Sequence, residues 1–98
     1  MTVYVVAQFR YTDKAKYDQY VEKFPEIFAK YNGTLLINNE NPTVLEGDWP
    51  MSKLVMMSFP SEQDFRDWAM SPEYLEIAKD RRAGSEGVVL LSEAFVNE

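Results

Sequence analysis

The sequence predicts an α+β domain whose four strands and intervening helical segments follow the order βαββαβ. Three observations carry this prediction. Runs of β-branched and aromatic residues are typical of strands, helical segments with recognisable caps separate them, and the first strand alternates between an apolar and a mixed face. We therefore expect a four-stranded antiparallel sheet with two helices on one face, in a single domain that covers residues 1–98.

Three of the strands lie in the first two thirds of the chain. Residues 2–11 form the first strand, and its apolar odd positions should pack on the helices. The second strand covers 34–38 and, after a polar bulge or loop, resumes at 43–46. The third strand, 53–59, should pair with 43–46 as a hairpin across a tight turn at 47–50.

The first helix is predicted between the first and second strands. Asp13 can cap it, and aromatic residues then recur at helical spacing over 14–31. Pro25 lacks a backbone donor, so we expect a kink or a restart near Phe24. Asn32-Gly33 should end the helix, since both residues tolerate the left-handed conformation of a C-cap.

The second helical region has two start signals. Residues 61–64 resemble a capping box, with an aspartate where Glu or Gln is usual, and Ser71-Pro72 supplies a second N-cap with proline at the first helical position. Gly84 and Gly87 should break this helix, and a last strand is expected over 88–96. The complete order is the ferredoxin-like arrangement.

The strands are apolar on both faces, although helices cover only one face of such a sheet. The residues concerned are Leu54 and Met56, which oppose Val55, Met57 and Phe59, and Leu36, which opposes Leu35 and Ile37. A homodimer that packs sheet against sheet would bury the second faces. The alternative is that such residues favour strands without implying any pairing.

Composition narrows the classes of function. The net charge is −6 and no basic cluster is present, which disfavours nucleic acid and acidic lipid as partners. The chain has no Cys and no His, so thiol and imidazole chemistry are excluded. No membrane span or signal peptide is evident, and we expect a cytoplasmic protein without a cofactor. No spaced Asp/Glu cluster resembles a binding loop, so a metal site is the least favoured reading.

With the order of elements in place, the sequence resembles the domain of unknown function 1330 family, within the dimeric α+β barrel superfamily. The matching residues span nearly the whole chain: the opening strand and Tyr17–Tyr20 helix, Tyr31-Asn32-Gly33, Leu45-Glu46-Gly47-Asp48-Trp49, Phe59-Pro60-Ser61, Trp68, Ser71-Pro72-Glu73-Tyr74 and Arg81. The resemblance implies a ferredoxin-like protomer and a face-to-face dimer, but no established reaction. Family members commonly carry His-Gly-Gly where this chain has Asn32-Gly33-Thr34. If that histidine does chemistry in relatives, this protein lacks it.

Glu46 and Arg81 are the candidate catalytic residues. Glu46 follows an apolar strand and would act as a general base if burial raised its pKa; otherwise it stabilises the turn or pairs with a cation. Arg81 shares a helical face with Tyr74, where a solvated cation would be out of place. It would clamp a carboxylate ligand or form a salt bridge within the protein, for example with Glu46.

The candidate ligand-binding residues are Asn32, Trp49, Tyr17 and Tyr74. Asn32 would place an amide at a pocket mouth, or serve only in the helix C-cap. Trp49 would stack on a ligand or pack across the dimer interface. Tyr17 would direct its hydroxyl into the same cavity, yet aromatic residues at helical spacing are usually core, as we also expect for Tyr74.

Six Tyr, six Phe and two Trp are more than one thin core of this size can easily hide. The leading hypothesis is therefore a homodimer that binds or transforms a small organic molecule in an aromatic-lined cavity. The alternative is a non-catalytic dimerisation or ligand-sensing module. The residues do not decide whether the protein is an enzyme.

Overall fold

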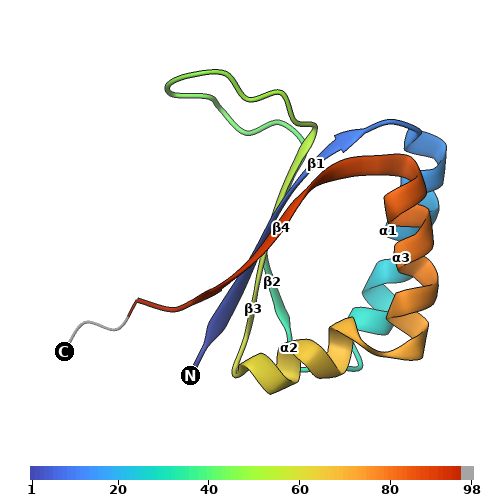
Figure 1. The fold of residues 1–98 in the computed structure, drawn as a ribbon, viewed down its shortest axis with the longest axis vertical. Helices are drawn as coiled ribbons and strands as arrows, with labels where there is room; N and C mark the ends of the chain where they lie inside the picture. The colour runs from blue at the N-terminus through green and yellow to red at the C-terminus, as the bar shows by residue number, and fades with distance from the viewer. Residues whose placement is uncertain (96–98) are drawn as a thin grey trace.

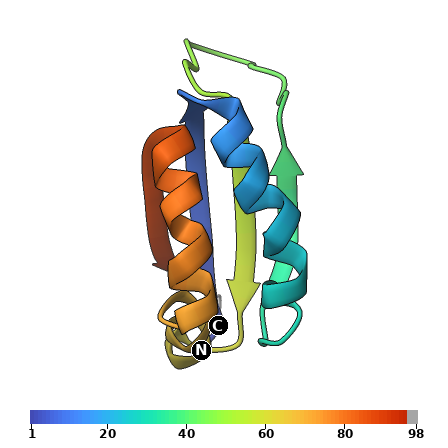
Figure 2. The same cartoon turned by 90° about the vertical axis from the view of Figure 1, so that its right-hand side faces the viewer.

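The computed structural model describes residues 1–95 as an antiparallel sheet with its helices on one face (Figure 1). Its elements are β1 (Val3–Tyr11), α1 (Lys14–Phe28), β2 (Thr34–Asn39), β3 (Lys53–Phe59), α2 (Glu62–Ala69), α3 (Pro72–Gly84) and β4 (Ser85–Glu93). The strands lie in the order β2-β3-β1-β4. Figure 2 shows α1 and α3 side by side in front of the sheet. The predicted fold class is confirmed.

The central strand β1 has one buried face, as its alternating pattern predicts. Val3, Val5, Ala7 and Phe9 are buried against the helices, and the odd positions of β3 from Lys53 to Phe59 lie on the same face. Side chains alternate across a strand, so the register that pairs Phe9 with Lys53 brings both to the helical face. This face is the floor of the protein core.

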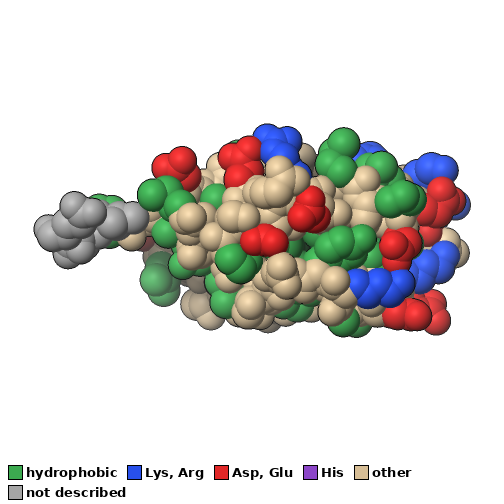
Figure 3. All heavy atoms as spheres, turned by 90° about the horizontal axis from the view of Figure 1, so that it is seen from below, with side chains coloured by type: hydrophobic (Ala, Val, Ile, Leu, Met, Phe, Trp, Pro, Cys, Tyr) green, Lys and Arg blue, Asp and Glu red, His purple; other side chains and the backbone are tan. Residues whose placement is uncertain are grey.

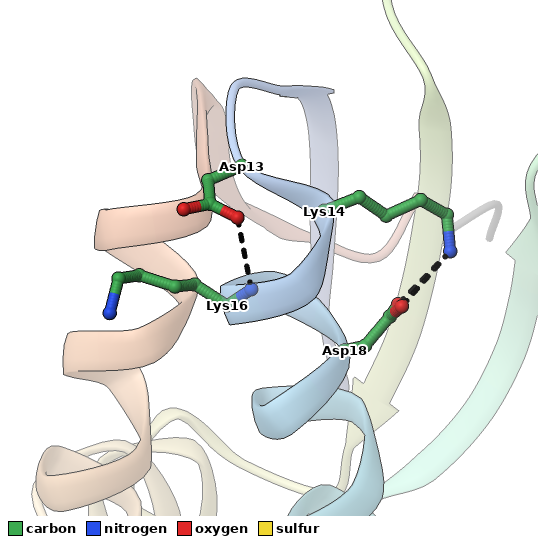
Figure 4. A network of polar contacts seen from close by, with 4 residues as sticks. All are labelled: Asp13, Lys14, Lys16 and Asp18. Atoms are coloured by element: carbon green, nitrogen blue, oxygen red, sulfur yellow. Dashed lines mark hydrogen bonds and ion pairs between the residues drawn. The ribbon is translucent and has the colours of Figure 1, made fainter.

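The start of α1 follows the prediction and its end does not. The Asp13 side chain accepts a hydrogen bond from the backbone N–H of Lys16, and Lys14 pairs with Asp18 one turn on (Figure 4). α1 then continues through Pro25 to Phe28 without a restart. Ring contacts on both sides of the proline, from Phe24 to Tyr20 and to Phe28, hold the two halves together.

The expected left-handed C-cap at residues 32–33 is wrong. α1 ends at Phe28, and its C-cap Ala29 has right-handed helical torsions, φ −63° and ψ −17°. Gly47 is the one residue with positive φ among residues 1–95. Gly33 is required for space instead, because a Cβ there would lie 2.7 Å from the ring of Phe59.

The predicted hairpin of 43–46 with 53–59 is also wrong. β2 itself, Thr34–Asn39, pairs with β3, and residues 40–52 form a loop. The strand ends where the Asn39 side chain accepts a hydrogen bond from the N–H of Asn41, a local turn that competes with the ladder. Pro42 then offers no N–H for pairing. Within this loop residues 46–47 form a bend, and Gly47 has φ 80°.

Both predicted helix starts in the second helical region are confirmed: α2 begins after Ser61 and α3 after Ser71. The Ser61 hydroxyl accepts from the N–H of Asp64 and donates to its carboxylate, and the Ser71 hydroxyl accepts from the N–H of Tyr74. α3 ends at Gly84 as predicted, but β4 begins at once with Ser85, so Gly87 lies inside a strand. The predicted end of the last strand, Val96, lies outside the described residues.

The face of the sheet opposite the helices, here the helix-free face, carries an apolar row across all four strands. The pairing register aligns Ile37 with Met56, Met56 with Val6, and Val6 with Leu90. The predicted alternation of β2 fails in part, because a bulge between Leu35 and Ile37 places these two residues on opposite faces. Figure 3 shows Lys and Arg side chains mostly toward the helices, on the right, and Asp and Glu side chains spread along the visible face.

Candidate functional site

A cavity of about 540 Å³ lies between the helices and the sheet. Its walls are mostly apolar and aromatic, and residues of α1, α3, β1 and β3 supply most of them. Those that the argument uses are Phe9, Tyr17, Tyr20, Phe24, Phe28, Lys53, Trp68, Tyr74 and Arg81. A volume of this size is typical of sites for small organic molecules.

The aromatic walls form one connected cluster. Aromatic residues of α1 recur every three or four positions from Tyr17, so they share the face that looks onto the sheet. The Trp68 ring from α2 lies 5.4 Å from that of Phe28 and 4.2 Å from that of Tyr74, centroid to centroid. Contacts between these rings fix the shape of the cavity, because tilted and edge-to-face pairs have narrow preferred geometries.

Two tyrosine hydroxyls meet at the α1–α3 contact. The Tyr20 and Tyr74 oxygens are 3.0 Å apart and share a hydrogen bond, with the rings edge to face. Burial raises the pKa of Tyr20 well above its ordinary value, since the phenolate would lose its hydration. This pair is a neutral hydrogen-bonding group inside the cavity.

One end of the cavity carries two cations. Lys53 is only 5% exposed, and its Nζ lies 5.0 Å from the centroid of the Tyr17 ring. The guanidinium carbon of Arg81 lies 5.2 Å from the centroid of the Phe9 ring. The Phe9 and Tyr17 rings are 6.0 Å apart, so the two cations flank one aromatic pair. We call these four residues the cationic end.

The cationic end lacks a counter-charge within residues 1–95. The ion pairs there join other groups, and none brings a carboxylate oxygen within 4.0 Å of Lys53 or Arg81. Arg81 Nε is buried without a hydrogen-bond acceptor in that part of the chain, as is Trp68 Nε1. Burial lowers the pKa of Lys53, and the more distant charges of Glu40 and Asp18 oppose this change.

The comparisons with known proteins identify the family. The profile of the domain of unknown function DUF1330 matches residues 2–95. The chain belongs to this family. The resemblance predicted from its motifs is therefore confirmed. A comparison with curated proteins gave no match.

Solved structures share the fold of this DUF1330 protein. A protein of unknown function from Rhodopseudomonas palustris is 16% identical with a TM-score of 0.82, over 98% of this chain and 84% of that one. SnoaB, a cofactor-independent oxygenase from Streptomyces nogalater, is 22% identical with a TM-score of 0.69, over 98% and 95%. A dimeric protein of unknown function and ferredoxin-like fold from Bacteroides fragilis is 16% identical with a TM-score of 0.66, over 95% and 96%. At such identities the likeness shows the fold alone.

The DUF1330 domain brings some of the candidate residues together. Tyr17, Tyr74 and Arg81 all line the cavity. Asn32 does not: it is exposed, and its amide donates to the Asp64 carboxylate at 2.9 Å. Lys53, which lines the cavity, was not predicted from the sequence. The sequence did contain a signal for it, because Lys53 is a charged residue on the apolar face of a strand.

The other two candidates lie on the far side of the sheet. Glu46 is exposed on the 40–52 loop, where it lines a separate pocket with Trp49. The Trp49 indole N–H donates to the Gln8 side-chain oxygen at 2.9 Å, which anchors the loop to the helix-free face. Glu46 and Arg81 therefore do not meet within one protomer, and the predicted salt bridge between them does not form.

Two findings concern metals and membranes. Among residues 1–95, no three carboxylates gather where they could hold a metal ion. No helix of that part of the chain has the length and apolar character needed to cross a membrane.

The buried tyrosines predict how stability changes at alkaline pH. Burial raises the pKa of Tyr11 to about 12, and it raises those of Tyr17 and Tyr20 above their ordinary value of 10.0. Above that value the unfolded chain loses these protons while the folded protein keeps them, so stability falls as pH rises. The lowered pKa of Lys53 makes stability rise with pH, but only below 10.5, the ordinary pKa of lysine. We therefore expect the thermal midpoint to fall progressively above about pH 10.5.

Thermal unfolding across this range, with the ultraviolet absorbance of tyrosinate recorded in parallel, checks this prediction. Tyr11→Phe removes one group of raised pKa and should make the fall shallower. A midpoint that stays constant up to pH 12 would show that the buried hydroxyls titrate normally.

Proposed function

We propose that this protein is a homodimer that binds a small organic molecule in the cavity between its helices and its sheet. The observation that carries the proposal is the cationic end: within residues 1–95, Arg81 Nε is buried without an acceptor, the nearly buried Lys53 forms no ion pair, and both residues line the aromatic cavity. A protein core built only for stability avoids such groups, because an unpaired buried cation is costly. Their presence favours a bound molecule over a purely structural core.

The dimer part of the proposal rests on the helix-free face. Its apolar row from Ile37 to Leu90 is open to solvent in one protomer, and Leu90 is 56% exposed. A two-fold axis would lay the rows of two protomers against each other. The Bacteroides fragilis protein of the same fold is described as dimeric, which supports a dimer here too. Cytoplasmic location stays a prediction.

Catalysis is the second candidate function, and the fold of SnoaB, a cofactor-independent oxygenase, is the observation that favours it. In this chain the cations of the cationic end could stabilise negative charge that develops on a bound molecule. Glu46 does not line this cavity in its own protomer, because it lies in the second pocket. It therefore remains a candidate base only for a molecule bound outside that cavity. In any assay that detects turnover, an unchanged rate after Glu46→Gln would rule out that role.

Tryptophan fluorescence can test whether the cavity binds ligands, because the two tryptophans lie on opposite faces of the sheet. Trp68 lines the cavity, whereas Trp49 lies on the helix-free face. A molecule bound in the cavity should change the emission of Trp49→Phe, which retains Trp68, and leave that of Trp68→Phe nearly unchanged. The probes are a panel of small aromatic metabolites, charged and neutral.

Native mass spectrometry of the protein purified without refolding gives an independent answer. We expect a dimer, and a mass above that of the bare dimer identifies a retained molecule. A clean dimer whose Trp49→Phe emission responds to no compound would favour the alternative, a non-catalytic dimerisation module. A clean monomer at micromolar concentration would contradict the dimer.

A further inference from the structure

We infer that the ligand of this cavity is an organic anion, with its negatively charged group bound at the cationic end and an apolar body on the aromatic walls. The inference rests on the proposed function, because it names the ligand class of the same site. Nothing in the family description or in the fold assigns such a ligand. It follows from how the cationic end is built.

The position of Lys53 is imposed by the sheet. Its register partner is Phe9, so the side chain enters the helical face with Val55 and Met57 rather than reaching solvent. A lysine on a strand end usually extends its ammonium into water along the surface. Here the residue is 5% exposed and its ammonium lies over the Tyr17 ring. A ring face stabilises a cation in part, but it does not neutralise the charge.

Arg81 enters the same cavity from the last turn of α3. Its guanidinium lies over the Phe9 ring, and the buried Nε has no acceptor in residues 1–95. A guanidinium presents its donors as a planar fork that matches the two oxygens of a carboxylate. A carboxylate bound in the cavity would accept a hydrogen bond from the Arg81 Nε and would also neutralise the charge of the guanidinium.

Acidic side chains nearby do not replace that acceptor. Asp18 is paired with Lys14 at 3.0 Å. Glu40 is exposed, and its charge adds to the effect of burial in raising the pKa of Tyr11. Burial raises the pKa of Tyr17 and of Tyr20, so both phenols stay neutral, and the Tyr20 hydroxyl shares a hydrogen bond with that of Tyr74. The cationic end therefore keeps an excess of positive charge inside an acidic protein of net charge −6.

The rest of the cavity describes the other part of the ligand. Away from the cationic end, Phe24, Phe28 and Trp68 offer ring surfaces, and the Tyr20–Tyr74 pair offers one neutral hydrogen bond. A body of one to three fused rings fits a volume of about 540 Å³. A carboxylate, a sulfonate or an acidic phenol on such a body shares the required chemistry.

A matched pair of dyes tests the charge requirement directly. 8-Anilino-1-naphthalenesulfonate is an anion, and N-phenyl-1-naphthylamine has the same aromatic skeleton without the sulfonate; both fluoresce when they enter an apolar cavity. With the wild-type dimer we expect the anionic dye to bind at least about tenfold more tightly, since a charge-assisted hydrogen bond is worth that factor or more. Lys53→Met and Arg81→Met should each remove most of this preference while leaving the neutral dye unaffected.

Lys79→Met is the control. Lys79 lies on α3, as Arg81 does, but it is exposed, and its Nζ pairs with Glu76. This substitution changes the net charge equally and should keep the full preference. The melting temperature of Arg81→Met should not fall, because the change removes a buried Nε that has no acceptor in residues 1–95. That of Lys53→Met should not fall either, because the change replaces a nearly buried charge with an apolar group. A preference that disappears together with the fold would instead indicate a structural role and overturn the inference.

The remaining outcomes separate this inference from the proposed function. If the neutral dye binds as tightly as the anion, or if both Met variants keep the preference, the cavity binds ligands but does not select anions. If neither dye binds, the cavity does not admit ligands, and the proposed function fails together with the inference.

Discussion

Replacing Leu90 with Glu is expected to convert the proposed dimer into a folded monomer. Leu90 stands on the helix-free face at the end of the apolar row, and it is 56% exposed in the protomer. Its replacement therefore leaves the protomer core intact, whereas the dimer would bury two copies of the new carboxylate. Each protomer would lose the burial of about half a leucine side chain, out of about 1.5–3 kcal/mol for full burial, so dimerisation should weaken at least about tenfold. Analytical ultracentrifugation at micromolar concentration measures this change.

Val89→Glu is the matched control for Leu90→Glu. Val89 is the next residue back in β4, it is 49% exposed, and it lies on the helical face of the sheet. This variant should remain a dimer with an unchanged circular dichroism spectrum. The sheet-against-sheet arrangement is excluded if Leu90→Glu stays dimeric, or if both variants dissociate alike.

Gly84→Ala is expected to destabilise the protein strongly for the addition of a single methyl group. Gly84 ends α3 against the first turn of α1, and its carbonyl accepts hydrogen bonds from the N–H groups of Thr12, at 2.9 Å, and Asp13, at 3.1 Å. An added Cβ would lie 2.6 Å from the Asp13 carbonyl oxygen and 2.9 Å from Tyr17 Cα. These are backbone atoms, which cannot rotate away, so α1 and α3 must move apart.

Overpacking of this kind costs about 1–3 kcal/mol, and the thermal midpoint of a domain of this size falls roughly 4–8 °C for each kcal/mol. Differential scanning calorimetry should therefore show a drop of several degrees or more. Ala83→Ser, at the exposed neighbouring position, should stay within about 0.5 kcal/mol of the wild type. A midpoint for Gly84→Ala equal to that of Ala83→Ser would mean that the α1–α3 contact is not tightly packed.

The fold could be predicted from local signals because most elements carry them without conflict. The alternation of β1, the Ser61 and Ser71 caps and the Pro72 start each specify their own element. The errors lie where a distant contact decided the outcome. Phe24 and Phe28, on either side of Pro25, pack on Trp68 of α2, and β3 pairs with Thr34–Asn39 rather than with 43–46.

The candidate site could be predicted less well, because a cavity is made by elements far apart in the chain. Tyr17, Tyr74 and Arg81 were found because their helical faces point to the core. Glu46 was misplaced because its position in a loop carries no information on which side of the sheet the loop lies. Lys53 could have been recognised only by trusting the strand register over the usual preference of lysine for water.

The pairing of β1 with β4 determines when the sheet can be completed during synthesis. These are the first and last strands of the domain, paired from Val3 with Glu93 to Tyr11 with Ser85. Closing so long a loop slows folding, since its entropy cost comes before the new contacts form. Until β4 has emerged from the ribosome, the backbone donors and acceptors on one edge of β1 stay unpaired. β1 is rich in β-branched residues, which favour pairing with other strands. The nascent chain therefore passes through a stage with an open, aggregation-prone edge, which ends only when its last strand arrives.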